Sequence, residues 1–140
     1  MKSLTARILA VGALALIGAG CATHSGEGVY APQNTTKYNY ENSEKFVLMD
    51  AGAQRSVTAN TLQEARLPDG HLDVAANVRN RDNKRIQVQV NCEFKDAQGL
   101  TIDSTPWQTL VLTENGQETV RFASMNSQAS RYTIRIRQAR

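Results

Sequence analysis

Few side chains in this sequence are of the types that carry out acid–base or metal chemistry. The 140 residues include two histidines, His24 and His71. Asp73 follows two positions after His71, and such a His-x-Asp pair could hold a metal ion, but the sequence offers no evident third ligand. A solvated strand edge explains the pair better. We therefore predict no metal site and no cofactor.

Nucleophilic chemistry has equally little support. The chain has two cysteines, Cys21 and Cys92. Cys92 falls on the apolar phase of an alternating segment, which predicts a buried thiol. There is no Gly-x-Ser-x-Gly motif, and turn or surface positions suit Asp96 and Asp103 better than a catalytic pair does. We therefore expect no catalytic activity.

The modification chemistry that the sequence does support lies near the N-terminus. A basic start and a short apolar run, residues 8–19, lead through small residues to Cys21. This order is typical of a secretory signal peptide, here residues 1–20. The apolar run is too short to cross a membrane, which takes roughly 20 residues. We therefore expect the chain to leave the cytoplasm.

The segment around Cys21 resembles a bacterial lipoprotein precursor, in which this cysteine is acylated and becomes the first mature residue. Ala19 and Gly20 fit the small residues required before the cysteine, whereas Gly18 stands where an aliphatic residue is preferred. Ala22 follows where an inner-membrane retention signal would place Asp. By resemblance to enteric lipoproteins, this implies a lipid anchor at the periplasmic face of the outer membrane.

Another interpretation of this segment remains open. An ordinary signal peptidase could cut among the small residues and release a soluble protein. Cys21 could then form a disulfide with Cys92. If Cys21 carries lipid instead, we expect Cys92 to be a small buried apolar side chain.

The charge balance argues against nucleic acid as a partner. The formal charge of +3 includes Lys2 and Arg7 of the predicted signal peptide. Removing these two takes 16 basic residues to 14 against 13 acidic ones, which leaves a mature charge of about +1. Nucleic-acid binding usually needs a much more basic surface.

The remainder divides into a linker and one domain. Residues 21–44 are polar and lack an apolar period, which predicts a flexible linker spanning on the order of 25 Å root-mean-square. Residues 45–140 alternate with a period of two, which predicts strands. The expected strands are 45–50, 56–67, 71–80, 86–94, 107–113, 118–124 and 132–138. A short helix within 58–67 is the alternative there.

Turn residues separate these segments. Residues 81–84 and 96–99 are predicted turns, the second closed by Gly99. Asn115-Gly116 predicts a two-residue hairpin, because both positions of such a turn need positive φ. About seven strands with this turn spacing predict an all-β, antiparallel, immunoglobulin-like β-sandwich.

The central block, residues 72–102, is similar to the B–C region of bacterial immunoglobulin-like modules. Together with the signal, the linker and the closing strand "RYTIRIR", it resembles the YcfL family of periplasmic lipoproteins over roughly residues 46–137. The resemblance implies work in the cell envelope, because some members are encoded beside an activator of a peptidoglycan synthase. It supplies no activity and no catalytic residue.

Basic residues and one tryptophan are the candidate contact residues. Around the turn at 81–84 they are Arg79, Arg81, Lys84 and Arg85. These four could meet anionic lipid headgroups or phosphate, or could only keep a charged hairpin tip soluble. Arg121, Arg135 and Arg137 would form an outward basic stripe if the last two strands pair. Trp107 is the first choice for a contact residue, although a lone tryptophan is more often core.

These observations favour a protein that acts by binding. The leading hypothesis is a lipid-anchored periplasmic interaction module, without catalysis, for a protein of the bacterial envelope. The alternative is a small-ligand or glycan binder that uses one sheet face. An enzyme has the least support.

Overall fold

A computed structural model describes residues 28–30 and 43–139. The predicted signal peptide, the lipidation residue Cys21 and most of the predicted linker lie outside these residues. The elements are β1 (Phe46–Leu48), α1 (Ala51–Ser56), β2 (Val57–Arg66), β3 (Leu72–Asn80), β4 (Ile86–Lys95), β5 (Thr101–Ser104), β6 (Gln108–Leu112), β7 (Gln117–Ala123) and β8 (Arg131–Gln138). None of the helical structure in the described part of the chain is long and apolar enough to span a membrane.

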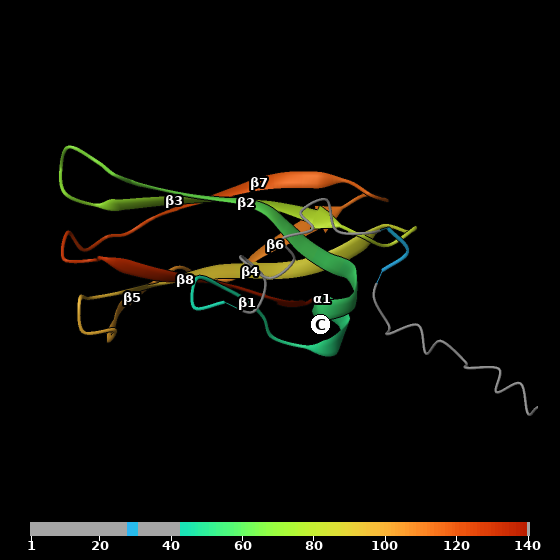
Figure 1. Ribbon diagram of the computed structural model, residues 1–140, viewed down its shortest axis with the longest axis horizontal. Helices are drawn as coiled ribbons and strands as arrows, with labels where there is room; N and C mark the ends of the chain where they lie inside the picture. Colours follow the sequence, from blue (N-terminus) through green and yellow to red (C-terminus); the bar gives the residue numbers. More distant parts are fainter. Residues whose placement is uncertain (1–27, 31–42, 140) are drawn as a thin grey trace, which may run out of the picture.

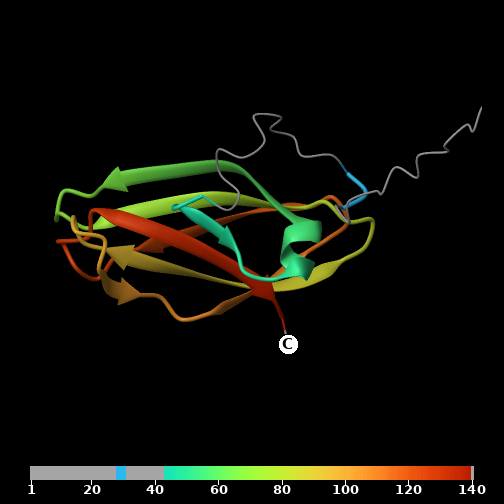
Figure 2. The ribbon, with the colours of Figure 1, turned by 60° about the horizontal axis from the view of Figure 1, so that its bottom comes forward.

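The strands form two sheets that pack face to face (Figures 1 and 2). One sheet has the order β1-β8-β4-β5, with β6 also paired to β4, and the other has the order β2-β3-β7. The predicted all-β sandwich is confirmed, with two differences. β5 was not predicted as a separate strand, and β1 runs parallel to β8, so the sheets are not wholly antiparallel.

The core lies between the two sheets and follows the predicted alternation. On β4 the inward side chains are Val88, Val90, Cys92 and Phe94, each no more than 1% exposed. The inward side chains of β8 lie beside them in the same sheet, and those of β3 face them from the other sheet; all are at most 5% exposed: Tyr132, Ile134, Ile136, Leu72, Val74, Ala76 and Val78. Burial of these apolar surfaces is the main stabilising contribution to the fold.

The short helix α1 was not predicted. Asp50 caps it, because its side chain accepts a hydrogen bond from the backbone N–H of Ala53 at 2.9 Å. A helix of six residues is too short to show an apolar stripe in the sequence. The alternative helix within 58–67 is wrong, since these residues belong to β2 and pair with β3.

Two predicted hairpins are instead crossings between the sheets. Residues 81–84 join β3 of the three-stranded sheet to β4 of the other sheet, and residues 113–116 join β6 back to β7. Asn115 has a positive φ of 52°, but Gly116 does not, so the predicted two-residue turn is wrong. The hairpin at 96–99 is confirmed, and Gly99 has a φ of 89° there.

The crossing at 113–116 also separates the basic residues that were expected to form one stripe. Arg121 lies on β7 and forms an ion pair with Asp73 of β3, in the same three-stranded sheet. Arg135 and Arg137 lie on β8 of the other sheet. Because β7 and β8 belong to different sheets, the predicted stripe does not exist.

Candidate functional site

The outer surface of the larger sheet gathers a tryptophan and two arginines. Trp107 directly precedes β6, whereas Arg135 and Arg137 lie on the outward phase of β8. The guanidinium carbon of Arg137 is 3.9 Å from the centroid of the Trp107 ring, and that of Arg135 is 5.3 Å away. Since β4 lies between β6 and β8, these side chains meet over the outer surface of β4. We call this surface the tryptophan face.

Side chains of β4 hold the two guanidinium groups in place. Arg135 forms an ion pair with Glu93 at 2.7 Å and donates from Nε to Asn91 Oδ1 at 3.0 Å. Arg137 donates from Nε to Gln89 Oε1 at 2.9 Å. These bonds fix the stacking geometry, so the tryptophan face is ordered before any partner arrives.

Asn91 shows how closely the tryptophan face is packed. Its side chain points away from the core, yet the residue is only 2% exposed. It accepts from Arg135 and donates to the backbone oxygen of Thr105 at 3.3 Å. A buried amide needs such hydrogen-bond partners. Because Asn91 is held by Thr105, it also helps to fix the position of Arg135.

The tryptophan face combines apolar area with an accessible cation. Trp107 and Arg137 are both partly exposed, while Met49, directly after β1, is 47% exposed and Val111 on β6 is 41% exposed. Among the described residues, Arg137 donates a hydrogen bond only from Nε, and its two terminal nitrogens donate none. A guanidinium stacked on an aromatic ring and bordered by apolar groups suits a carboxylate next to an apolar side chain.

Only two of the four basic residues predicted as a contact cluster at 79–85 are exposed. Arg79 is 5% and Arg81 is 3% exposed, so neither is a surface contact residue. Arg79 donates to Asn115 Oδ1 at 2.9 Å, and Arg81 donates to the backbone oxygen of Tyr30 at 3.0 Å. The second crossing and residues 28–30 cover these side chains. Lys84 and Arg85 are exposed, as predicted.

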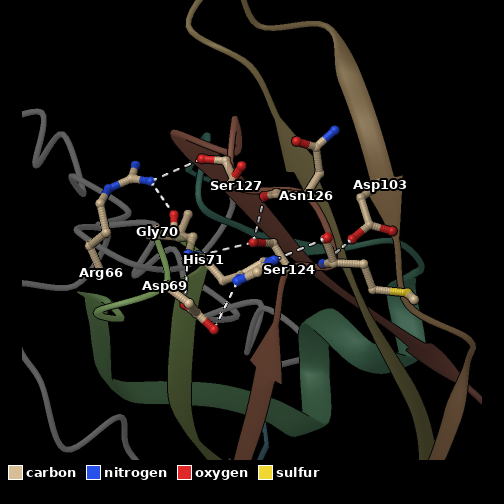
Figure 3. Close-up of polar contacts among 10 residues, drawn as sticks. Arg66, Asp69, Gly70, His71, Asp103, Ser124, Asn126 and Ser127 are labelled. Carbon is tan, nitrogen blue, oxygen red and sulfur yellow. Dashed lines mark hydrogen bonds and ion pairs between the residues drawn. The ribbon is translucent and has the colours of Figure 1, made fainter.

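A histidine, two aspartates and a serine lie close together (Figure 3), at the end of the sandwich away from the two crossings (Figure 1). His71 Nδ1 lies 3.0 Å from Asp69 Oδ2, and Nε2 lies 3.2 Å from the backbone oxygen of Met125. The backbone N–H of His71 lowers the pKa of the Asp69 carboxyl. Ser124 is buried and donates to the backbone oxygen of Asn126 at 2.9 Å. These groups are used to close loops and do not form a nucleophile–base pair.

The predicted partner of His71 has a different neighbour. Asp73 lies 3.8 Å from Nε of Arg121 on β7, so the His-x-Asp pair is not brought together as a ligand set. Within residues 28–30 and 43–139, no group of three His, Cys, Asp or Glu side chains could hold a metal ion.

The two other carboxylates weighed as a catalytic pair serve turns, as the sequence indicated. Asp96 accepts from the backbone N–H groups of Gln98 and Leu100, each at 2.9 Å, within the β4–β5 turn. Asp103 accepts from the backbone N–H of Met125 at 2.6 Å. Each carboxylate therefore fixes a loop.

Cys92 is buried, as predicted. The residue is 0% exposed, and burial raises the pKa of its thiol to about 12. A thiol in this environment is protonated at neutral pH and is a poor nucleophile.

The outer surface of the smaller sheet is different in character. A shallow hollow there is lined by small and polar residues: Thr61, Gln63, Ala75, Ala76, Asn77, Thr119 and Arg121. None of the described residues that line this hollow is aromatic. Sugar rings commonly stack on aromatic side chains, so this surface is the weaker candidate for glycan binding.

The β4 partners of the arginines were missed from the sequence. Gln89, Asn91 and Glu93 occupy the polar phase of 86–94, and the arginines occupy the same phase of 132–138. Complementary polar phases on two strong strands would have indicated these pairs if the strands had been assumed to be neighbours.

Comparison with known proteins places the fold. Crystal structures of cj0090 from Campylobacter jejuni and of a DUF1425 family member from Shewanella sp. pv-4 are similar to this chain. The first has a TM-score of 0.60 at 14% identity and covers 69% of this chain and 100% of its own. The second has a TM-score of 0.56 at 23% identity and covers 65% of this chain and 86% of its own.

These structural likenesses concern the fold alone. No curated protein matches the sequence. The family described as a protein of unknown function, DUF1425, matches residues 44–138, which span the whole sandwich. The chain therefore belongs to the DUF1425 family.

Proposed function

We propose that this protein is a lipid-anchored, non-catalytic interaction module of the bacterial cell envelope. The resemblance to the YcfL lipoproteins and the residues before Cys21 support an acyl anchor at the periplasmic face of the outer membrane. Several acyl chains would hold the domain firmly, because each buried methylene contributes about 0.8 kcal/mol.

One observation carries the binding part of the proposal: the stacked, hydrogen-bonded pair of Trp107 and Arg137 on a partly exposed sheet surface. Tryptophan and arginine are the side chains most enriched among residues that dominate protein–protein binding energy. The matching partner is an envelope protein that presents a carboxylate beside an apolar side chain. The carboxylate would bind the terminal nitrogens of Arg137, and the apolar group would cover Met49 or Val111.

The absence of catalysis is part of the same proposal. Two groups of the described residues support it: the thiol of Cys92 is buried, and both ring nitrogens of His71 contact acceptors. Glycan binding at Trp107 is the second candidate, supported by the same exposed ring. The kind of molecule that the tryptophan face binds in cells, protein or glycan, distinguishes the two candidates.

Site-specific photo-crosslinking in cells tests the proposal. A photo-reactive amino acid at Thr109 lies on the tryptophan face, since Thr109 pairs with Gln89. The matched control is Thr119, which pairs with Asn77 on the outer surface of the smaller sheet. Both threonines are exposed on a strand.

We expect one protein adduct of defined mass from the Thr109 probe and none from the Thr119 probe. Trp107→Ala and Arg137→Ala should each remove that adduct, whereas Arg121→Ala should leave it unchanged. Capture of glycan strands alone would favour the second candidate. Adducts that form equally at both positions would contradict the proposal.

A further inference from the structure

A short N-terminal segment, residues 28–30, contacts the end of the sandwich where both crossings lie (Figure 1). The backbone N–H of Gly28 donates to the backbone oxygen of Arg55, and that of Tyr30 donates to the backbone oxygen of Arg81 at 2.9 Å. Arg81 returns a bond from Nε to the Tyr30 oxygen at 3.0 Å. The Tyr30 hydroxyl donates to Glu114 at 2.6 Å. We call residues 28–30 the docked segment.

The docked segment fits closely. A Cβ atom added to Gly28 would lie 2.5 Å from the backbone oxygen of Arg81. Real Cβ atoms essentially never come so near, so a larger residue would have to move the segment away. Arg81 is 3% exposed, and its backbone also bonds to Ser56 at 2.7 Å, so the receiving surface is part of the rigid domain.

We infer that the docked segment turns this end of the sandwich toward the membrane and brings its basic residues against the phosphates of anionic lipids. This inference rests on the proposed acyl anchor at Cys21. Seven residue steps separate Cys21 from Gly28, which allow about 24 Å at full extension. If the linker were undocked as far as Glu44, the same estimate would give about 80 Å. Docking therefore keeps the domain close to the bilayer and fixes which end faces it.

The charges at this end suit a lipid surface. Gly28, Val29, Arg55 and Lys84 line one shallow hollow, and Arg85 follows Lys84. The three basic side chains are exposed, and Val29 is 65% exposed. Such juxtamembrane basic residues are attracted by anionic headgroups.

The acidic groups at the same end have partners within the domain. Glu114 accepts from Tyr30 at 2.6 Å, and Asp82 lies 3.5 Å from the hydroxyl of Ser56. Asp50, at the start of α1, likewise accepts from the backbone N–H groups of Ala53 and Gln138.

The opposite end would then project into the periplasm. It carries the β2–β3, β4–β5 and β7–β8 connections (Figure 1), with Leu100 67% and Met125 86% exposed. The tryptophan face runs along the side of the sandwich and stays accessible in this orientation.

Energy transfer from two matched sites tests the inference. A fluorescent amino acid is placed at Asn83, in the crossing near the docked segment, or at Gln98, in the β4–β5 turn at the opposite end. Both positions are exposed. The acceptor is a dye on lipid headgroups in vesicles of phosphatidylethanolamine and phosphatidylglycerol. The two ends are on the order of 30 Å apart, the length of a ten-residue strand, so transfer from Asn83 should be several-fold more efficient than transfer from Gln98.

The protein is attached to the vesicles in two ways, so that the proposed anchor and the proposed orientation are tested independently. One sample is the lipidated protein from membranes. The other is the chain from residue 21 onward, coupled at Cys21 to a maleimide lipid, a reaction that spares the buried Cys92. If the native protein carries no lipid, the proposed anchor is wrong, while the coupled chain still reports the orientation.

Variants of the docked segment complete the test. Gly28→Ala should abolish the difference between the two sites, while Val29→Ala, which trims an exposed side chain and keeps the backbone bonds, should preserve it. Lys84→Gln with Arg85→Gln should reduce the difference, most of all at low salt. Equal transfer from both sites of the unmodified domain, or a difference that survives Gly28→Ala, would overturn the inference.

Discussion

Replacing Arg137 by methionine keeps the aliphatic stem over Trp107 and removes the guanidinium group. The variant loses the stack at 3.9 Å and the bond to Gln89 at 2.9 Å. A cation–π contact at a partly exposed site contributes about 0.5–1 kcal/mol, and a typical hydrogen bond contributes about 0.5–1.5 kcal/mol. Because both groups are partly exposed, we expect a total loss of about 1–2 kcal/mol in the free energy of unfolding.

A double-mutant cycle isolates the stack from the hydrogen bond. The variants are Arg137→Met, Trp107→Leu and the two together, and we expect a coupling free energy of about 0.5–1 kcal/mol. Arg121→Met combined with Trp107→Leu is the control. Arg121 is an exposed arginine on the other sheet, so its coupling to the tryptophan should be near zero.

Urea unfolding measured by far-UV circular dichroism supplies these free energies. Tryptophan fluorescence is unsuitable, because Trp107 is the only tryptophan and two of the four proteins in the cycle lack it. A coupling no larger than that of the control would refute the reasoning. The tryptophan face would then not be ordered in solution, and the binding proposal would lose its main support.

Three further predictions concern other parts of the domain. Cys92 should react with a thiol reagent at pH 8 about 1000-fold more slowly in the folded protein than in urea, because burial raises its pKa from 9.0 to about 12. The same shift predicts that the free energy of unfolding falls as the pH rises above 9, where the unfolded thiol ionises. A native rate equal to the rate in urea would contradict the burial. Gly99→Ala should lower the free energy of unfolding by about 1–2 kcal/mol in a urea titration, because φ is 89° there, and an unchanged midpoint would refute the turn geometry. The hydrogen bond to Glu114 raises the pKa of Tyr30, so Glu114→Gln should shift part of the ultraviolet tyrosine titration to lower pH. Docking of residues 28–30 should weaken as the pH rises through the raised pKa. Identical titrations of the two proteins would show that the hydrogen bond is absent.

The strands and their buried faces could be predicted from local pattern. Residues 86–94 and 132–138 alternate so regularly that the inward position of Cys92 followed from the sequence. A period of two is a property of each strand alone, and it survives whatever the neighbouring strand is.

The connections between strands could not be predicted in the same way. Asn115-Gly116 is a turn signal in either a hairpin or a crossing between sheets, and only long-range pairing decides between them. The burial of Arg79 and Arg81 has the same origin. Their partners, Asn115 and Tyr30, are 36 and 51 residues away in the sequence.

The candidate site was predictable in its parts but not as a whole. Trp107, Arg135 and Arg137 could each be selected by residue type. Their meeting depends on the strand order β8-β4-β6, which local pattern does not encode. The same order explains why Arg121, selected on the same grounds, lies on another surface.

Intact mass of the protein extracted from bacterial membranes is the most direct test of the central claim, that an interaction domain is held in the envelope by lipid on Cys21. We predict a chain that begins at Cys21 and carries the added mass of a diacylglyceryl group and an amide-linked acyl chain. Cys21→Ser should abolish this species. A chain that begins at another residue, or one with an unmodified thiol at Cys21 that washes out with the soluble periplasmic fraction, would contradict the account.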